Sequence, residues 1–142
     1  MSGALLDVNV LVAIAWPQHI HHGAARAWFA REAPRGWATS PVTESGFIRV
    51  SSNPKAIDDA RTPVEAAEFL GTLQSVGAWS FWSDDVQLTA GMQGVRSFRQ
   101  VTDAHLLQLA YERGGAVATF DVGLLRLAEE RGQSAVLIDA SV

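Results

Sequence analysis

The sequence has 142 residues, of which 48% are hydrophobic and 18% charged, and its formal net charge is −4. This length and mixture are typical of one globular domain, here expected over residues 1–142, and they exclude a disordered chain. Cysteine is absent, which excludes disulfides, thiolate nucleophiles and zinc held by cysteine. The acidic balance is also not typical of proteins that bind nucleic acid through a broadly basic surface.

Apolar segments in the sequence are short. The longest, Val8–Trp16, has about half of the roughly 18 to 20 residues that a membrane-spanning helix requires, and Asn9 interrupts it. The start of the sequence has neither the basic segment nor the small-residue cleavage site of a secretory signal. We therefore expect a cytoplasmic protein that does not associate with membranes.

The first half of the sequence alternates short apolar strands with helical patterns. Pro17 and Pro34 each follow a segment of helical character and end it. Thr62 and Glu65 form a capping box around Pro63, which predicts a helix that runs to about residue 76. The expected order is a strand at 4–6, helices at 8–15 and 21–32, a strand at 37–39, and helices at 41–50 and 63–76.

The second half of the sequence continues this alternation. Ser83 and Thr102 are each expected to cap a helix, and Gly114-Gly115 ends the second of these helices. Short apolar strands separated by helices predict an α/β fold, with a central parallel sheet of about five strands and helices on both faces. The expected order is a strand at 79–82, helices at 84–94 and 103–113, a strand at 116–120, a helix at 122–130 and a strand at 135–138.

Four acidic residues stand at equivalent points of this expected fold. Asp7 directly follows the first strand and Asp121 the fourth, whereas Glu44 and Asp103 lie in the first turns of helices. Each acid alone has an ordinary structural explanation, because carboxylates commonly cap helices or complement the helix dipole. Together they fall on the edge formed by the carboxyl ends of the strands, where open α/β sheets bind their ligands.

Four carboxylates packed within several ångströms would repel one another by several kcal/mol. A divalent cation that prefers oxygen ligands relieves this repulsion, and Mg²⁺ and Mn²⁺ fit such a site. Ions of this kind activate water and stabilise the leaving oxygen in phosphodiester hydrolysis. The pattern therefore favours a metal-dependent nuclease whose catalytic residues and metal ligands are Asp7, Glu44, Asp103 and Asp121.

Four segments carry a resemblance to a known family. They are residues 5–11 (LLDVNVL), 43–50 (TESGFIRV), 101–107 (VTDAHLL) and 118–121 (ATFD). With these segments in this order, the chain resembles the PIN-domain ribonucleases, specifically the VapC toxins of type II toxin–antitoxin systems. The resemblance implies a homodimer, a five-stranded parallel sheet and inhibition by a cognate VapB-type antitoxin. It also implies endoribonuclease activity on RNA that needs Mg²⁺ or Mn²⁺.

The resemblance extends to individual site residues. The four acids match the acidic quartet of the family, and Asp7 and Asp103 match the acids most central to metal binding. Asn9 and Thr119 match positions that support the acids through hydrogen bonds. Arg49, on the same expected helix as one of the acids, is the basic residue that we expect near the substrate.

Two other interpretations compete with a magnesium-dependent nuclease. His19, His21 and His22 lie close together, but no acid or cysteine nearby completes a zinc site, so we do not expect a transition metal there. The second alternative is a PIN-fold binding module without catalysis that acts as an antitoxin partner and co-repressor. The presence of all four acids favours the enzyme.

Overall fold

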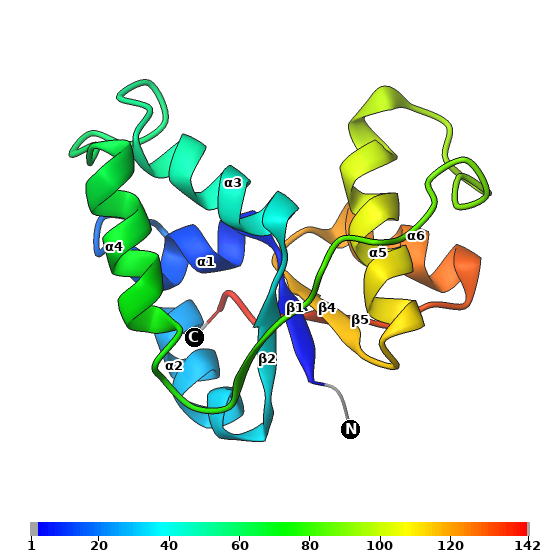
Figure 1. The fold of residues 1–142 in the computed structure, drawn as a ribbon, viewed down its shortest axis with the longest axis horizontal. Helices are drawn as coiled ribbons and strands as arrows, with labels where there is room; N and C mark the ends of the chain where they lie inside the picture. The colour runs from blue at the N-terminus through cyan, green and yellow to red at the C-terminus, as the bar shows by residue number, and fades with distance from the viewer. Residues whose placement is uncertain (1–2, 142) are drawn as a thin grey trace.

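Five parallel strands form the central sheet of the computed structural model, which describes residues 3–141 (Figure 1). The strands are β1 (Ala4–Leu6), β2 (Trp37–Thr39), β3 (Trp79–Phe81), β4 (Ala116–Thr119) and β5 (Ala135–Leu137). They lie in the order β3-β2-β1-β4-β5, so β1 is central, with β2 and β4 as its neighbours. Leu5 of β1 pairs with Ala38 of β2 and with Val117 of β4.

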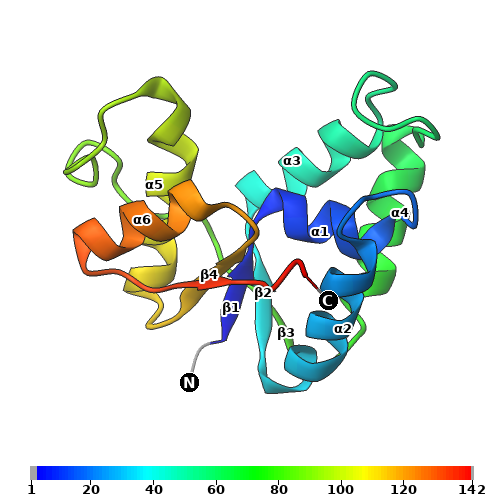
Figure 2. The same cartoon turned by 180° about the vertical axis from the view of Figure 1, so that it is seen from behind.

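Helices cover both faces of this sheet, and the expected α/β fold is confirmed. The helices are α1 (Val8–Ala15), α2 (His22–Glu32), α3 (Pro41–Ser51), α4 (Pro63–Leu73), α5 (Val101–Glu112) and α6 (Val122–Arg131). Figures 1 and 2 show α1 to α4 on one side of the sheet, and α5 and α6 on the other. Within residues 3–141, no helix is both long enough and apolar enough to cross a bilayer.

Alternate residues of the central strands point into two separate cores. Leu6 of β1 packs into the core beneath α1 to α4, whereas Leu5 packs into the core beneath α5 and α6. The same alternation places Trp37 of β2 in the first core and Ala38 in the second. Because both faces of these strands are buried, the polar residues that follow them are gathered at the strand ends.

Local sequence and a close helix contact fix the start of α3. The Ser40 hydroxyl accepts a hydrogen bond from the Thr43 backbone N–H, and the Thr43 hydroxyl accepts one from the Ser40 N–H. Gly46 lies so close to α1 that an added Cβ atom would come within 2.5 Å of the Val8 side chain. The cap and this contact together hold Glu44, in the first turn of α3, at the carboxyl edge of the sheet.

The helix expected over residues 84–94 is wrong, because residues 82–97 contain no helix. Asp84 pairs instead with the His105 ring of α5, and the Ser83 carbonyl accepts a hydrogen bond from Arg113. Leu88, which would have contributed to an apolar helix face, is 38% exposed. Ser83 and Asp84, which were expected to start a helix, instead hold an irregular segment against α5 through hydrogen bonds.

Thr102 does not cap α5, contrary to expectation. The helix begins at Val101 and continues from a 3₁₀ turn over Phe98–Gln100, where the Ser97 hydroxyl accepts a hydrogen bond from the Arg99 N–H at 3.2 Å. This earlier start leaves Asp103 in the first turn of the helix, as expected. Elsewhere the differences are at element ends, and α4 keeps its expected capping box but ends at residue 73.

Candidate active site

Three aspartates meet at the carboxyl ends of β1 and β4. Asp7 follows β1 and is the N-cap of α1, and Asp121 follows β4 and is the N-cap of α6. Asp103 comes from the first turn of α5 and is close enough to the other two for their charges to affect its ionisation. Because β1 and β4 are neighbours in the sheet, the structure brings together three of the four predicted acids.

Thr119, the last residue of β4, links two of these aspartates. Its buried hydroxyl donates a hydrogen bond to Asp7 Oδ2 at 2.8 Å and accepts one from the Asp121 backbone N–H at 3.0 Å. Asp7 Oδ1 also accepts from the Val8 N–H at 2.8 Å, and Asp121 Oδ1 accepts from the Gly123 N–H at 2.8 Å. These bonds hold both carboxylates at helix N-termini, and Thr119 makes the kind of contact that was predicted for it.

Burial and neighbouring negative charge disfavour the ionised forms of Asp103 and Asp7. Burial, followed by the charges of Asp7 and Asp121, raises the pKa of Asp103 to about 6. Burial also raises the pKa of Asp7, hydrogen bonds from Thr119 and Val8 oppose that rise, and the charge of Asp121 adds to it. A cation beside these carboxylates would act in the opposite direction, because it stabilises their ionised form.

Glu44 is held by a different set of partners. Its Oε2 atom accepts hydrogen bonds from the Thr39 hydroxyl at 2.7 Å and from the Gln74 side chain at 3.0 Å. Thr39, the last residue of β2, also accepts a hydrogen bond from the Trp79 indole N–H at 3.0 Å. Glu44 is not among the causes of the raised aspartate pKa values, so the fourth predicted acid lies at this edge without joining the aspartate group.

The donor atoms at this edge are those that Mg²⁺ and Mn²⁺ prefer, namely carboxylate oxygens. Within residues 3–141, no three acidic, histidine or cysteine side chains are spaced as a closed ligand set. Instead, Glu44 accepts a hydrogen bond from Gln74, and one oxygen of Asp121 accepts a hydrogen bond from the Gly123 N–H. A cation that drew the carboxylates together would relieve the repulsion among the aspartates, so the residues fit such an ion.

A hollow of about 320 Å³ borders this edge between α1, α3 and α5. Its lining includes Arg49 and Ser45 of α3, Val8 of α1 and Thr102 of α5. Val8 and Thr102 are each next in sequence to an aspartate of the site. The exposed Arg49 guanidinium group therefore belongs to a surface beside the acids, where the sequence predicted a basic residue near the substrate.

A second hollow, of about 410 Å³, borders the acids near the start of α6. Asn9 contributes to its lining and is exposed, and no hydrogen bond joins its side chain to an acid in the described part of the chain. The hydrogen bond by which Asn9 was predicted to support an acid is therefore not present among the described residues. The described lining residues are Asn9, His19, Ile20, His21, Phe120 and Asp121.

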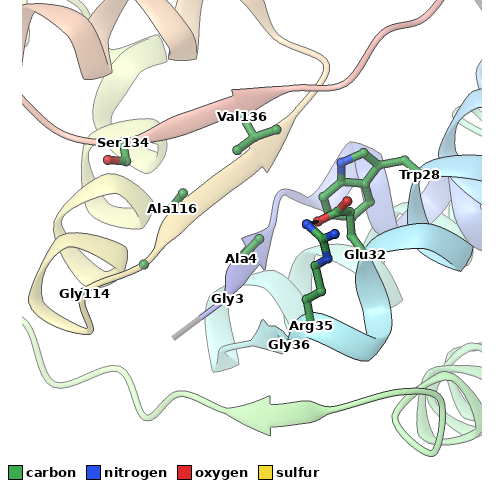
Figure 3. A pocket seen from close by; sticks show the side chains of 11 residues that line it. Gly3, Ala4, Trp28, Glu32, Arg35, Gly36, Gly114, Ala116, Ser134 and Val136 are labelled. Atoms are coloured by element: carbon green, nitrogen blue, oxygen red, sulfur yellow. Dashed lines mark ion pairs between the residues drawn. The ribbon is translucent and has the colours of Figure 1, made fainter. Parts of the chain in front are cut away.

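The opposite edge of the sheet also has a hollow, but it lacks the chemistry of the acidic edge. Figure 3 shows this space of about 420 Å³ at the amino ends of the strands, lined mainly by small residues and by Trp28, Glu32 and Arg35. Glu32 is the one acid among its described lining residues, and its carboxylate lies 4.0 Å from Arg35. The acidic edge is therefore the better candidate for a catalytic site.

Sequence reasoning did not single out Gln74 or Thr39 as site residues. Thr39 stands at a strand end in the expected sheet, and that position could have marked it as a candidate site residue. Gln74 reaches Glu44 from the end of α4, across 30 residues of sequence, and no local pattern indicates that contact. His21 and Phe120 were likewise not expected to line a hollow beside the acids.

Comparison with known proteins agrees with the observed fold. A family model described as the PIN domain matches residues 4–130. The chain is 46% identical over 125 residues to Ribonuclease VapC39 of Mycobacterium tuberculosis, which covers 85% of this chain and 90% of that protein. It is 51% identical over 122 residues to Ribonuclease VapC38 of the same species, which covers 85% of this chain and 86% of that protein.

Solved structures share the fold at low sequence identity. FitAcB from Neisseria gonorrhoeae matches with a TM-score of 0.61 at 17% identity, covering 97% of this chain and 98% of that one. FitAB bound to an IR36 DNA fragment matches with a TM-score of 0.63 at 19% identity, covering 94% and 93%. These structures support the fold alone. The family model and the identity to the curated relatives together show that the chain belongs to the PIN-domain family, among the VapC ribonucleases.

Proposed function

We propose that this protein is a metal-dependent endoribonuclease that hydrolyses RNA phosphodiester bonds as the toxin of a type II toxin–antitoxin module. The observation that carries the proposal is the meeting of Asp7, Asp103 and Asp121 at adjacent strand ends. It is supported by curated relatives that are named ribonucleases over most of the chain. A purely binding role would not require carboxylates placed so that neighbouring charges raise the pKa values of Asp103 and Asp7.

In this proposal, Asp7, Asp103 and Asp121 hold Mg²⁺ or Mn²⁺, and Glu44 is the fourth acid of the site. When bound, the cation lowers the pKa of the attacking water and neutralises charge on the phosphodiester. Thr119 keeps Asp7 oriented through its hydroxyl hydrogen bond. Two donors already occupy Oε2 of Glu44, and no described residue donates to Oε1, so Oε1 is the oxygen available for a ligand.

The substrate is held by groups outside the acids. Arg49 can pair with a phosphate of the RNA beside the site, since its guanidinium group is exposed and lines the hollow next to Val8. A positive group beside the acids would position the RNA backbone while the carboxylates act at the phosphate to be cut.

The proposal includes two protein partners. As a VapC toxin, the chain would form a homodimer and would be inhibited by a VapB-type antitoxin encoded nearby. One solved structure of similar fold, FitAB, is bound to a DNA fragment.

A cleavage assay with purified protein and structured RNA tests the function. We expect cleavage in Mg²⁺ or Mn²⁺, and loss of that cleavage in Asp7→Asn. Glu129→Gln is the matched control, because it removes the same charge from an exposed position of α6 and should cleave normally. Equal inactivity of the wild type and Asp7→Asn, with antitoxin binding intact, would support the binding module instead.

A further inference from the structure

We propose that the hollow beside Asp121 holds an unpaired base of the RNA, from a nucleotide that flanks the phosphate to be cut. This inference rests on the proposed function, and it adds a base-binding site with His21, Phe120 and His19 as its main residues. The hollow has a volume of about 410 Å³ and is lined by residues from three parts of the chain: the start of α1, the turn before α2, and the end of β4 with the start of α6.

The position of the hollow favours a nucleotide next to the reacting phosphate. Asp121 belongs both to the hollow's lining and to the aspartate group. Asn9, another lining residue, is two positions after Asp7 in sequence. A phosphate held at the aspartates would therefore have its neighbouring nucleotide at the mouth of this hollow.

Two aromatic rings form one wall of the hollow. The rings of His21 and Phe120 are stacked, with 4.8 Å between their centroids and 28° between their planes. Phe120 is half-buried and packs against the core beneath α1 to α4, so this wall is anchored to the fold. Aromatic and histidine rings on a rigid support are the surfaces on which proteins stack splayed bases of single-stranded RNA.

Polar groups at the hollow can hydrogen-bond to the edge of a base. The Nδ1 atom of His19 accepts a hydrogen bond from the His21 backbone N–H at 3.0 Å, which places the ring hydrogen on Nε2 as a free donor. Burial and the neighbouring charges of His21 and His22 lower the pKa of His19, which keeps this ring neutral. The exposed side-chain amide of Asn9 adds two N–H donors and a carbonyl acceptor.

The two hollows beside the acids differ in charge, so each suits a different part of the RNA. The described lining of the second hollow contains no lysine or arginine, and it includes Ile20, whose side chain is 88% exposed. Such a surface suits an uncharged base rather than a phosphate. Arg49 lines the first hollow, so the phosphate-binding group and the base-binding rings lie in separate hollows that both border the acidic edge.

A double-mutant cycle between protein and RNA tests the proposal. An RNA oligonucleotide with one mapped cleavage site is prepared intact and with a single abasic nucleotide at each position that flanks the cut. Dissociation constants are measured in the inactive Asp7→Asn background for the parent, for His21→Ala and for Phe120→Leu, which keeps an apolar side chain. The control is Tyr111→Ala, because Tyr111 is 59% exposed at the far end of α5.

We expect His21→Ala to weaken binding of the intact oligonucleotide by roughly 5- to 150-fold, the range measured for loss of one stacked base. The same change should have little effect once the base at one flanking position is removed, and Tyr111→Ala should have none on either RNA. Phe120→Leu should show the same pattern with a smaller loss.

Two results would overturn the base-binding site while leaving the nuclease intact. One is an equal loss on intact and abasic RNA at every flanking position. The other is a loss of antitoxin binding in His21→Ala with unchanged RNA affinity, which would make the occupant a protein segment. If the wild type cuts no RNA, the proposed function fails first and this inference fails with it.

Discussion

The acidic edge of the sheet has two parts that differ in how the protein stabilises their negative charge. At the ends of β1 and β4, burial and the charges of neighbouring aspartates raise the pKa values of Asp103 and Asp7, and Asp103 accepts no hydrogen bond from the described residues. At the end of β2, Glu44 receives two hydrogen bonds on one oxygen. The first part lacks a counter-charge, whereas protein donors already stabilise the second. A cation should therefore bind first at the aspartates.

Removal of divalent cations should have the largest effect. In excess EDTA, RNA cleavage should fall to background, because the carboxylates then repel the phosphodiester instead of binding a cation that attracts it. Added Mn²⁺ or Mg²⁺ should restore cleavage, while circular dichroism should show a folded protein throughout. Cleavage that persists in chelator would show that the aspartates work without a metal.

Neutralisation of one aspartate should reduce activity by the next largest factor. We expect Asp103→Asn to lower kcat/KM on the order of 100-fold or more, since a metal ligand worth several kcal/mol is lost. The variant should stay folded because this side chain accepts no hydrogen bond from the described residues. Steady-state cleavage of a short RNA measures the change. Normal rates in Asp103→Asn would show that Asp103 is not a residue of the active site.

Loss of the glutamine that orients Glu44 should have a moderate effect. Gln74→Ala removes one of two donors to Glu44 Oε2, and support of this kind contributes to metal affinity. We expect Mn²⁺ to bind on the order of 10-fold more weakly, as measured by isothermal titration calorimetry. Gln87→Ala, at an exposed position of the irregular segment before α5, is the control. Unchanged affinity in both variants would mean that Glu44 plays no part in metal binding.

The two parts of the edge should respond with opposite signs when the metal-free protein is unfolded. Glu44→Ala leaves the donors of Thr39 and Gln74 without their acceptor, so the free energy of unfolding should fall by about 1–3 kcal/mol. Asp103→Asn removes the repulsion between this carboxylate and its neighbours, and it should raise the free energy of unfolding by a smaller amount. Urea denaturation in EDTA measures both, and changes of the same sign would show that the two parts do not differ in this way.

The smallest effect should be a dependence of metal-free stability on pH. The pKa of Asp103 is about 6 in the folded chain, against an ordinary value of 3.8, so the folded state binds more protons between these values. The free energy of unfolding should therefore decline as pH rises from about 4 to about 6 and then level off. Asp103→Asn should lack this part of the decline, and parallel curves for both proteins would contradict the raised pKa.

The sequence predicted the features that depend on neighbouring residues. Asp7 and Asp121 follow apolar strands directly, so their place at the sheet edge was readable, and Thr119 was marked by the motif that contains Asp121. Contacts between distant segments were not readable. Gln74 reaches Glu44 from the end of α4, a contact that no local pattern indicates.

The expected helix over residues 84–94 failed for a related reason. Ser83 and Asp84 have the composition of a helix start, but in the folded chain they bond to Arg113 and His105 of the α5 region. Local preference for a helix was therefore overridden by tertiary hydrogen bonds. Asp103 kept its predicted place even though the helix that carries it began earlier than expected.

Thermal unfolding of the wild type and Asp103→Asn, each in EDTA and in Mn²⁺, tests the central claim most directly. If the aspartates are held close together at a cost that a cation relieves, the variant should melt higher in EDTA. The wild type should gain more from Mn²⁺, so that the order of the two melting temperatures reverses. An equal response of both proteins to Mn²⁺, or none in either, would contradict a metal site at the aspartates.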